Sequence, residues 1–154
     1  NRLKNLKRIK ERAYEDIKDR KSVYLISDQE DIEKCDELAQ RLKEQNFYVI
    51  QTDFSVEQIK IFQEHRRNLA QCDGVLIYHS RNNVKWIQMK LLDLRKAPGY
   101  GRVSPLLARG LYVENKLVMG KLSNIEENVL LLSSNSKMNQ EKVNDFCKKI
   151  EEHA

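Results

Sequence analysis

Polar side chains that could bind a ligand or take part in catalysis follow three hydrophobic runs of the chain. Each group holds a hydroxyl or a carboxylate; the groups are Ser27, Asp28 and Gln29, then Asp53, Phe54 and Ser55, and then His79, Ser80 and Arg81. Carboxylate oxygens bind divalent cations, so Asp28 and Asp53 could together hold one. Helix capping by Asp28 and Ser55 is the simpler interpretation, because such side chains satisfy the free amides of a first helical turn.

Several kinds of site are not predicted. The residues after the first run, SDQED, contain no glycine, so neither a dinucleotide-binding fingerprint nor a phosphate-binding loop begins there. The histidines, at positions 65, 79 and 153, each lack a second donor at the spacing of metal ligands, and no metal site is expected. We find no complete catalytic motif and assign no residue a catalytic role.

The cysteines and the absence of long apolar runs favour a cytoplasmic protein. Cys35, Cys72 and Cys147 are odd in number and form no C-x-x-C pair, so we expect buried thiols in a reducing compartment. No apolar run approaches the roughly 20 residues of a membrane span. The charged N-terminus lacks the apolar stretch of a signal peptide. We therefore expect no membrane partner.

The net charge of +5 is concentrated at the start of the chain. Residues 1–21 hold nine Lys or Arg against four acids, so the other residues balance at 19 against 19. We predict a basic, amphipathic linker helix over residues 1–21 and an α/β domain over residues 22–154. Binding of nucleic acid is not predicted, because a basic leading helix is typical of a solvated linker. The chain begins with Asn1, which favours a domain of a larger protein.

Short apolar runs alternate with helical periodicity from residue 22 onward. We predict strands over residues 22–27, 47–52, 74–79, 107–113 and 129–132. Helices follow them over residues 28–46, 55–72 and 84–97, with a closing helix over residues 139–151. Apolar strands that alternate with helices indicate a parallel sheet covered on both faces. Right-handed crossovers then give a doubly wound, flavodoxin-like sheet of five strands, with the three polar groups around one crevice.

The helix over residues 84–97 is apolar nearly all round, which is typical of a buried helix or an interface. Met89 and Leu92 fall opposite the expected core stripe. Residues 81–109 hold seven basic residues against one acid, and residues 28–37 hold six acids against one lysine. Such opposed charges favour head-to-tail self-assembly. The predicted interface residues are Lys85, Met89, Leu92 and Arg95 on one surface and Asp31 and Glu33 on the other.

The chain resembles a Toll/interleukin-1 receptor (TIR) domain. The resemblance lies in the order SVYLIS, helix, FYVIQTD, helix, CDGVLIYHS and a tryptophan after five residues, with Ser80 and Trp86 as its most specific marks. The segments EHRRNLAQCDGVLIYHS, WIQMKLLDLRKAPGYGR and PLLARGLYVEN are similar to the TIR-like domains fused to bacterial STAND-type NTPases and antiviral defence proteins. The resemblance covers about residues 22–114.

The resemblance implies an assembly domain that acts by contacts with its own copies, with other domains of the parent protein or with a partner. TIR domains that hydrolyse NAD carry a glutamate four residues after this tryptophan, where this chain has Lys90. A lysine inverts the charge that would stabilise an oxocarbenium-like cation, so a non-enzymatic function is expected. The alternatives are NAD cleavage with Glu64 or Asp53 as the acid, or a nucleotide-sensing module. For these, the resemblance implies ligand contacts from Ser27, Asp28, Asp53, Ser80, Trp86 and Lys90, without a resident cofactor.

Overall fold

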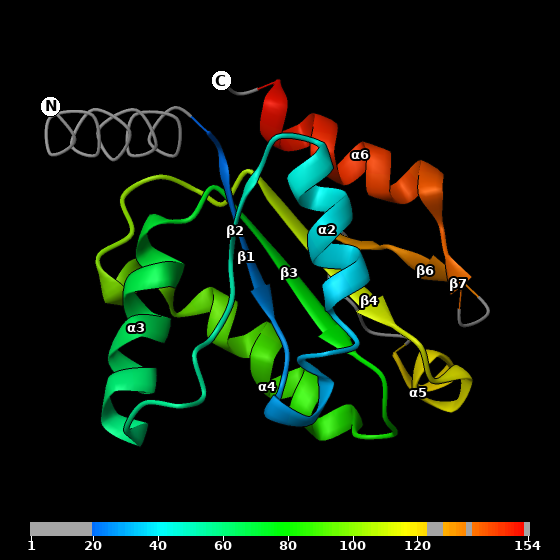
Figure 1. Ribbon diagram of the computed structural model, residues 1–154, viewed down its shortest axis with the longest axis horizontal. Helices are drawn as coiled ribbons and strands as arrows, with labels where there is room; N and C mark the ends of the chain where they lie inside the picture. Colours follow the sequence, from blue (N-terminus) through cyan, green and yellow to red (C-terminus); the bar gives the residue numbers. More distant parts are fainter. Residues whose placement is uncertain (1–19, 123–127, 135–136, 153–154) are drawn as a thin grey trace, which may run out of the picture.

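In the part of the chain that the structure describes, five parallel strands form one central sheet in the order β2-β1-β3-β4-β5 (Figure 1). The structure is a computed structural model, and it describes residues 20–122, 128–134 and 137–152. The strands are β1 (Ser22–Ile26), β2 (Tyr48–Ile50), β3 (Gly74–His79), β4 (Ala108–Val113) and β5 (Val129–Leu131). The predicted flavodoxin-like α/β fold is confirmed. The predicted linker helix lies mostly outside the described residues.

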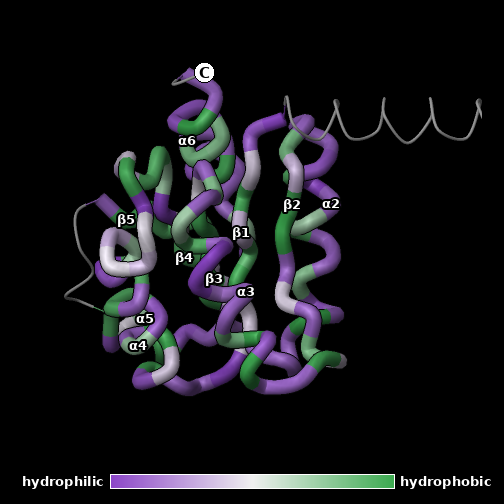
Figure 2. Tube along the Cα trace, turned by 90° about the vertical axis from the view of Figure 1, so that its left-hand side faces the viewer, coloured by the Kyte–Doolittle hydropathy of each residue, from purple (hydrophilic) through white to green (hydrophobic). Residues whose placement is uncertain are grey.

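The helices cover both faces of the sheet, as a doubly wound fold requires (Figures 1 and 2). One face carries α2 (Asp36–Glu44) and α6 (Gln140–Glu151). The other face carries α3 (Gln58–Gln71), α4 (Val84–Arg95) and α5 (Lys116–Lys121). Two short 3-10 helices among the described residues, η1 (Gln29–Asp31) and η2 (Ala97–Tyr100), extend the turns after β1 and α4.

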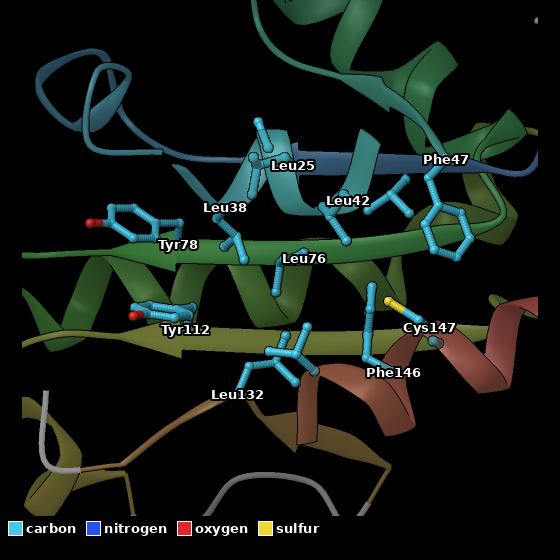
Figure 3. Close-up of a cluster of buried hydrophobic side chains, with 14 of the residues drawn as sticks. Leu25, Leu38, Leu42, Phe47, Leu76, Tyr78, Tyr112, Leu132, Phe146 and Cys147 are labelled. Carbon is cyan, nitrogen blue, oxygen red and sulfur yellow. The ribbon is translucent and has the colours of Figure 1, made fainter. Parts of the chain in front are cut away.

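A hydrophobic core lies between the sheet and the α2–α6 layer (Figure 3). Phe146 of α6 is fully buried there, beside Leu76 and Leu132. A Cβ atom at Gly110 of β4 would come within 2.9 Å of Leu76 and 3.1 Å of both Leu132 and Phe146. Glycine therefore allows α6 to approach the sheet closely.

A second core lies between the sheet and the α3–α4–α5 layer, where the alternate residues of the strands point. Tyr24 and Ile77 are buried here, as the continuous apolar runs predicted. Helix α4 contributes Ile87 and Leu94, and α3 contributes Leu69 near its C-terminal end. Cys72 is buried in this second core, and Cys35 and Cys147 are buried in the first. Burial raises the pKa of the thiols of Cys35 and Cys72 to about 12 and that of Cys147 to about 11.

Some local predictions were wrong. Ser55 does not cap α3: its amide and hydroxyl both donate to Asp53, and the helix begins three residues later. Helix α5 was not predicted, nor was the hairpin of β6 (Ser133–Ser134) and β7 (Lys137–Met138). Asn46 does end the α2 segment as predicted, with a left-handed φ of 69° that Asn tolerates better than most residues. No helix of the described residues is long and apolar enough to span a membrane.

Candidate functional site

The carboxyl ends of β1 and β3 lie side by side at the point where the strand order reverses, which is where ligands bind in open α/β sheets. Here Asp31, which is fully buried, accepts hydrogen bonds from the amide of Ser80 (3.1 Å) and from its hydroxyl (2.5 Å). Asp28 caps η1 by accepting from the amide of Asp31 at 3.1 Å, which confirms its predicted capping role. Ser27, a predicted ligand contact, is buried.

Arg81 closes this cluster from the solvent side. Its guanidinium forms ion pairs with Asp28 and Glu30. Lys34 donates to the hydroxyl of Ser80 at 3.2 Å. The polar groups after β1 and β3 are thus engaged with one another. Asp53 and Ser55, in the loop after β2, are hydrogen-bonded to each other instead, so the structure does not bring Asp53 together with Asp28 as a cation site.

The tautomer of His79 determines whether this cluster could bind a metal ion. Donor atoms of Asp28, Asp31 and His79 lie within 4.8 Å of one another. However, Nε2 of His79 accepts a hydrogen bond from the amide of Asn83 at 3.2 Å, so the proton of the neutral ring is on Nδ1. A protonated Nδ1 has no lone pair for a cation; it lies 3.9 Å from a carboxylate oxygen of Asp31 and makes no hydrogen bond with the described residues. The residues therefore do not fit a metal centre.

A cavity of about 380 Å³ opens beside this cluster, between β1, the loop after β2, α3 and α4. Its polar lining includes Thr52, Gln58 and Lys96. The apolar lining comprises Ile26, Phe54, Ile61, Phe62, Met89 and Leu92. Apolar walls with a few converging polar groups are typical of small-molecule sites. We call this cavity the α3–α4 pocket.

A chain of hydrogen bonds lies at the floor of the α3–α4 pocket. The hydroxyl of Tyr24 on β1 is 2.7 Å from Nδ1 of His65 on α3. Nε2 of His65 contacts a carboxylate oxygen of Asp93 on α4, and Tyr100 donates to the other oxygen at 2.9 Å. Sequence reasoning missed this chain, because His65 and Asp93 are far apart along the sequence. We call Tyr24, His65 and Asp93 the relay.

The protonation states of the relay follow from its surroundings. Burial lowers the pKa of His65 despite the neighbouring carboxylate, so its imidazole is neutral near pH 7. Burial alone would raise the pKa of Asp93, but the hydrogen bonds from His65 and Tyr100 and the nearby positive charge of Lys90 lower it. Burial raises the pKa of Tyr24. The carboxylate thus accepts from Nε2–H of His65, and Nδ1 accepts from the phenol of Tyr24.

Trp86 and Lys90, the residues marked by the sequence, lie between the pocket and the cluster. The indole of Trp86 stacks on His79 with ring centres 5.0 Å apart. Lys90 lines the pocket, and its ammonium group lies 5.6 Å from the centre of the Trp86 ring. Glu64 and Asp53 are the acids proposed to replace the missing glutamate in the enzymatic alternative. Glu64 forms an ion pair with Arg67 at 4.0 Å, and Asp53 accepts a hydrogen bond from the hydroxyl of Ser55. The carboxylate that lines the pocket is instead that of Asp93.

The predicted interface residues are exposed, with one exception. Met89, Leu92, Lys85, Arg95 and Glu33 all lie at the surface. Asp31 is fully buried against Ser80, so its prediction as a surface contact was wrong. Comparison of the chain with protein-family models, with curated proteins and with solved structures finds no match.

Stability should fall as the pH is lowered through the range in which free histidine titrates. Burial lowers the pKa of both His65 and His79 in the folded state. Below about pH 6.5 the unfolded chain therefore binds more protons than the folded chain, which favours unfolding. We expect His65→Gln and His79→Gln each to flatten the dependence of the urea midpoint on pH between about 5.5 and 7.5. An unchanged slope in both variants would contradict the assignment of neutral rings.

Proposed function

We propose that this chain is a TIR-like assembly domain that associates with its own copies through the exposed face of α3 and α4. The observation that carries the proposal is a group of large apolar side chains on that surface. Ile59 and Phe62 of α3 are 66% and 51% exposed, and Met89 and Leu92 of α4 are 67% and 53% exposed. We call these residues the α3–α4 face. Large exposed apolar patches mark interaction sites in soluble domains.

Charge around the α3–α4 face supports the choice of partner. Helix α4 and the turn after it carry Lys85, Lys90, Arg95 and Lys96. The opposite layer begins with acids, of which Glu33 and Asp36 are exposed. Because α4 and α2 lie on opposite faces of the sheet, contact between α4 of one copy and α2 of the next is head-to-tail. Head-to-tail contacts build rings or open chains, which suits a domain whose function is assembly.

The resemblance of residues 22–114 to TIR-like domains supports the same function. In this resemblance, Lys90 stands where NAD-cleaving TIR domains carry a glutamate, four residues after Trp86. We expect the concentrated domain to release no nicotinamide from NAD, because the charge at this position is opposite to the one required. Steady release, measured by chromatography, would favour the enzymatic alternative over this proposal.

The test of the proposal is self-association of variants of the α3–α4 face. Met89→Glu combined with Leu92→Glu should raise the dissociation constant at least tenfold, because charge replaces apolar surface in the contact. The measurement is sedimentation equilibrium over a range of protein concentrations. Leu117→Glu is the matched control, since Leu117 of α5 is also 66% exposed but lies off this face.

A charge-reversal pair tests the head-to-tail arrangement. Lys85→Glu with Arg95→Glu should weaken association and reduce its dependence on salt. Adding Glu33→Lys and Asp36→Lys should recover part of the loss if the two surfaces meet. A wild-type domain that stays monomeric at high concentration, or variants that associate like the wild type, would refute the proposal.

A further inference from the structure

The α3–α4 pocket has an apolar interior and a basic mouth. Among its apolar walls, Ile26 is buried and Phe54 and Ile61 are half-buried, so these side chains lie toward the inside. Two lysines also line the pocket. Lys90 is half-buried, and Lys96 is exposed, which places its charge toward solvent. One part of the pocket therefore suits an apolar group and another part suits a negative charge.

Three cations around the pocket are available to a ligand. Within the described part of the chain, none of Lys90, Lys96 and the neighbouring Arg66 forms an ion pair. The guanidinium of Arg66 lies 4.3 Å from the centre of the ring of Phe62, which lines the pocket. Like charges gathered around one cavity attract a small anion, most strongly at low salt.

Asp93 is the one carboxylate among the described residues that line the pocket, and its oxygens are already engaged. One oxygen contacts Nε2 of His65, and the other accepts a hydrogen bond from Tyr100. The relay is thus satisfied largely by its own hydrogen bonds. Neither Lys90 nor Lys96 donates a hydrogen bond to a described residue, so their ammonium groups keep donors for a ligand.

We propose that the α3–α4 pocket binds a small molecule with an apolar body and a single carboxylate. The body packs against Phe54, Ile61 and Phe62, and the carboxylate lies between the ammonium groups of Lys90 and Lys96. Lysine binds an anion as a compact point charge, which suits a lone carboxylate. This inference goes beyond assembly, because it concerns the interior of the pocket.

A nucleotide fits this pocket less well than a carboxylate does. The phosphates of nucleotides are usually bound by backbone amides of a glycine-rich loop at the start of a helix. No glycine is among the described residues that line the pocket. The charge that the pocket offers comes instead from two flexible side chains.

The experiment compares 4-phenylbutanoate with 4-phenylbutanamide, which has the same ring and chain without the charge. Amide chemical shifts are followed at protein concentrations at which sedimentation shows a monomer, because the pocket and the α3–α4 face share Phe62, Met89 and Leu92. The carboxylate should bind roughly five- to tenfold more tightly than the amide, since two exposed ion pairs are added. This preference should shrink as salt is raised.

Trp86 gives a separate readout of Lys90. It is the one tryptophan of the sequence, and the ammonium group of Lys90 lies 5.6 Å from the centre of its ring. A bound carboxylate that draws Lys90 away from this ring should change the fluorescence of Trp86. The neutral amide should leave the fluorescence nearly unchanged.

Variants separate the two lysines from general hydrophobic binding. Lys90→Met and Lys96→Met should each weaken binding of 4-phenylbutanoate about two- to fivefold and leave binding of the amide unchanged. Lys85→Met is the matched control, because Lys85 is exposed on the same helix but does not line the pocket. Ile61→Trp, which fills the cavity, should weaken both probes equally. Absence of binding in the wild type, equal affinity for the two probes, or an equal loss in Lys85→Met would overturn the proposal.

Discussion

Phe146→Ala is expected to lower the free energy of unfolding by about 3–5 kcal/mol, the range for truncating a buried phenylalanine. The ring is fully buried between α6 and the sheet and lies against Leu76 and Leu132 (Figure 3). Its loss would leave a cavity that the surrounding strands cannot close, because α6 already lies close to the backbone at Gly110. Urea unfolding followed by circular dichroism measures the change.

Phe62→Ala is the control for this substitution. It makes the same chemical change on another helix, but Phe62 is about half exposed, so the cost should stay within about 0.5 kcal/mol. The comparison therefore separates packing from helix propensity. Similar losses in both variants would show that α6 does not pack on the sheet as described.

Asp31→Ala is the second large effect, with an expected loss of about 3 kcal/mol or a fall in melting temperature of roughly 6–12 °C. The buried carboxylate of Asp31 accepts from both the amide and the hydroxyl of Ser80, and alanine would leave these donors without a partner. Asp31→Asn keeps one oxygen acceptor and should lose about half as much. Differential scanning calorimetry measures each change.

The same substitution at Asp53 serves as the reference for Asp31→Ala. Asp53 is exposed and binds Ser55 within its own loop, so Asp53→Ala should leave the melting temperature nearly unchanged. Exchange of the Ser80 amide with solvent should also become faster in Asp31→Ala alone. A loss below about 1 kcal/mol for Asp31→Ala would mean that this carboxylate does not hold the end of β3.

The sheet could be predicted from the sequence because its strands are continuous apolar runs, each followed by helical periodicity. The periodicity of α3 was less informative. This periodicity puts Ile59, Phe62 and Leu69 on one predicted core face of the helix. In the structure only Leu69, near the C-terminal end of α3, is buried, whereas Ile59 and Phe62 in its first turns are exposed to solvent. Helix α5 has only six residues, too few for a periodic signal.

The relay was harder to predict, because the fold alone brings its members together. His65 and Asp93 are separated by 28 residues. Both lie in segments that resemble TIR-like domains, but the resemblance gave neither of them a role. A signal did exist in the helical phase. His65 lies one turn before the buried Leu69, and Asp93 lies one turn before the buried Ala97, so each places an ionisable group on an inward face. A buried ionisable side chain requires a hydrogen-bond or ion-pair partner, and His65 and Asp93 are partners of each other.

The ends of the sheet determine how copies of this chain can meet. Its edge strands, β2 and β5, are only three residues long each, whereas β3 and β4 have six. An edge that short offers few free amides and carbonyls to a strand from another molecule. A strand of a second molecule therefore finds little backbone to pair with at either edge of the sheet. Such pairing between molecules is the first step toward amyloid-like fibres. The proposed assembly through helices would therefore bring copies together without merging their sheets.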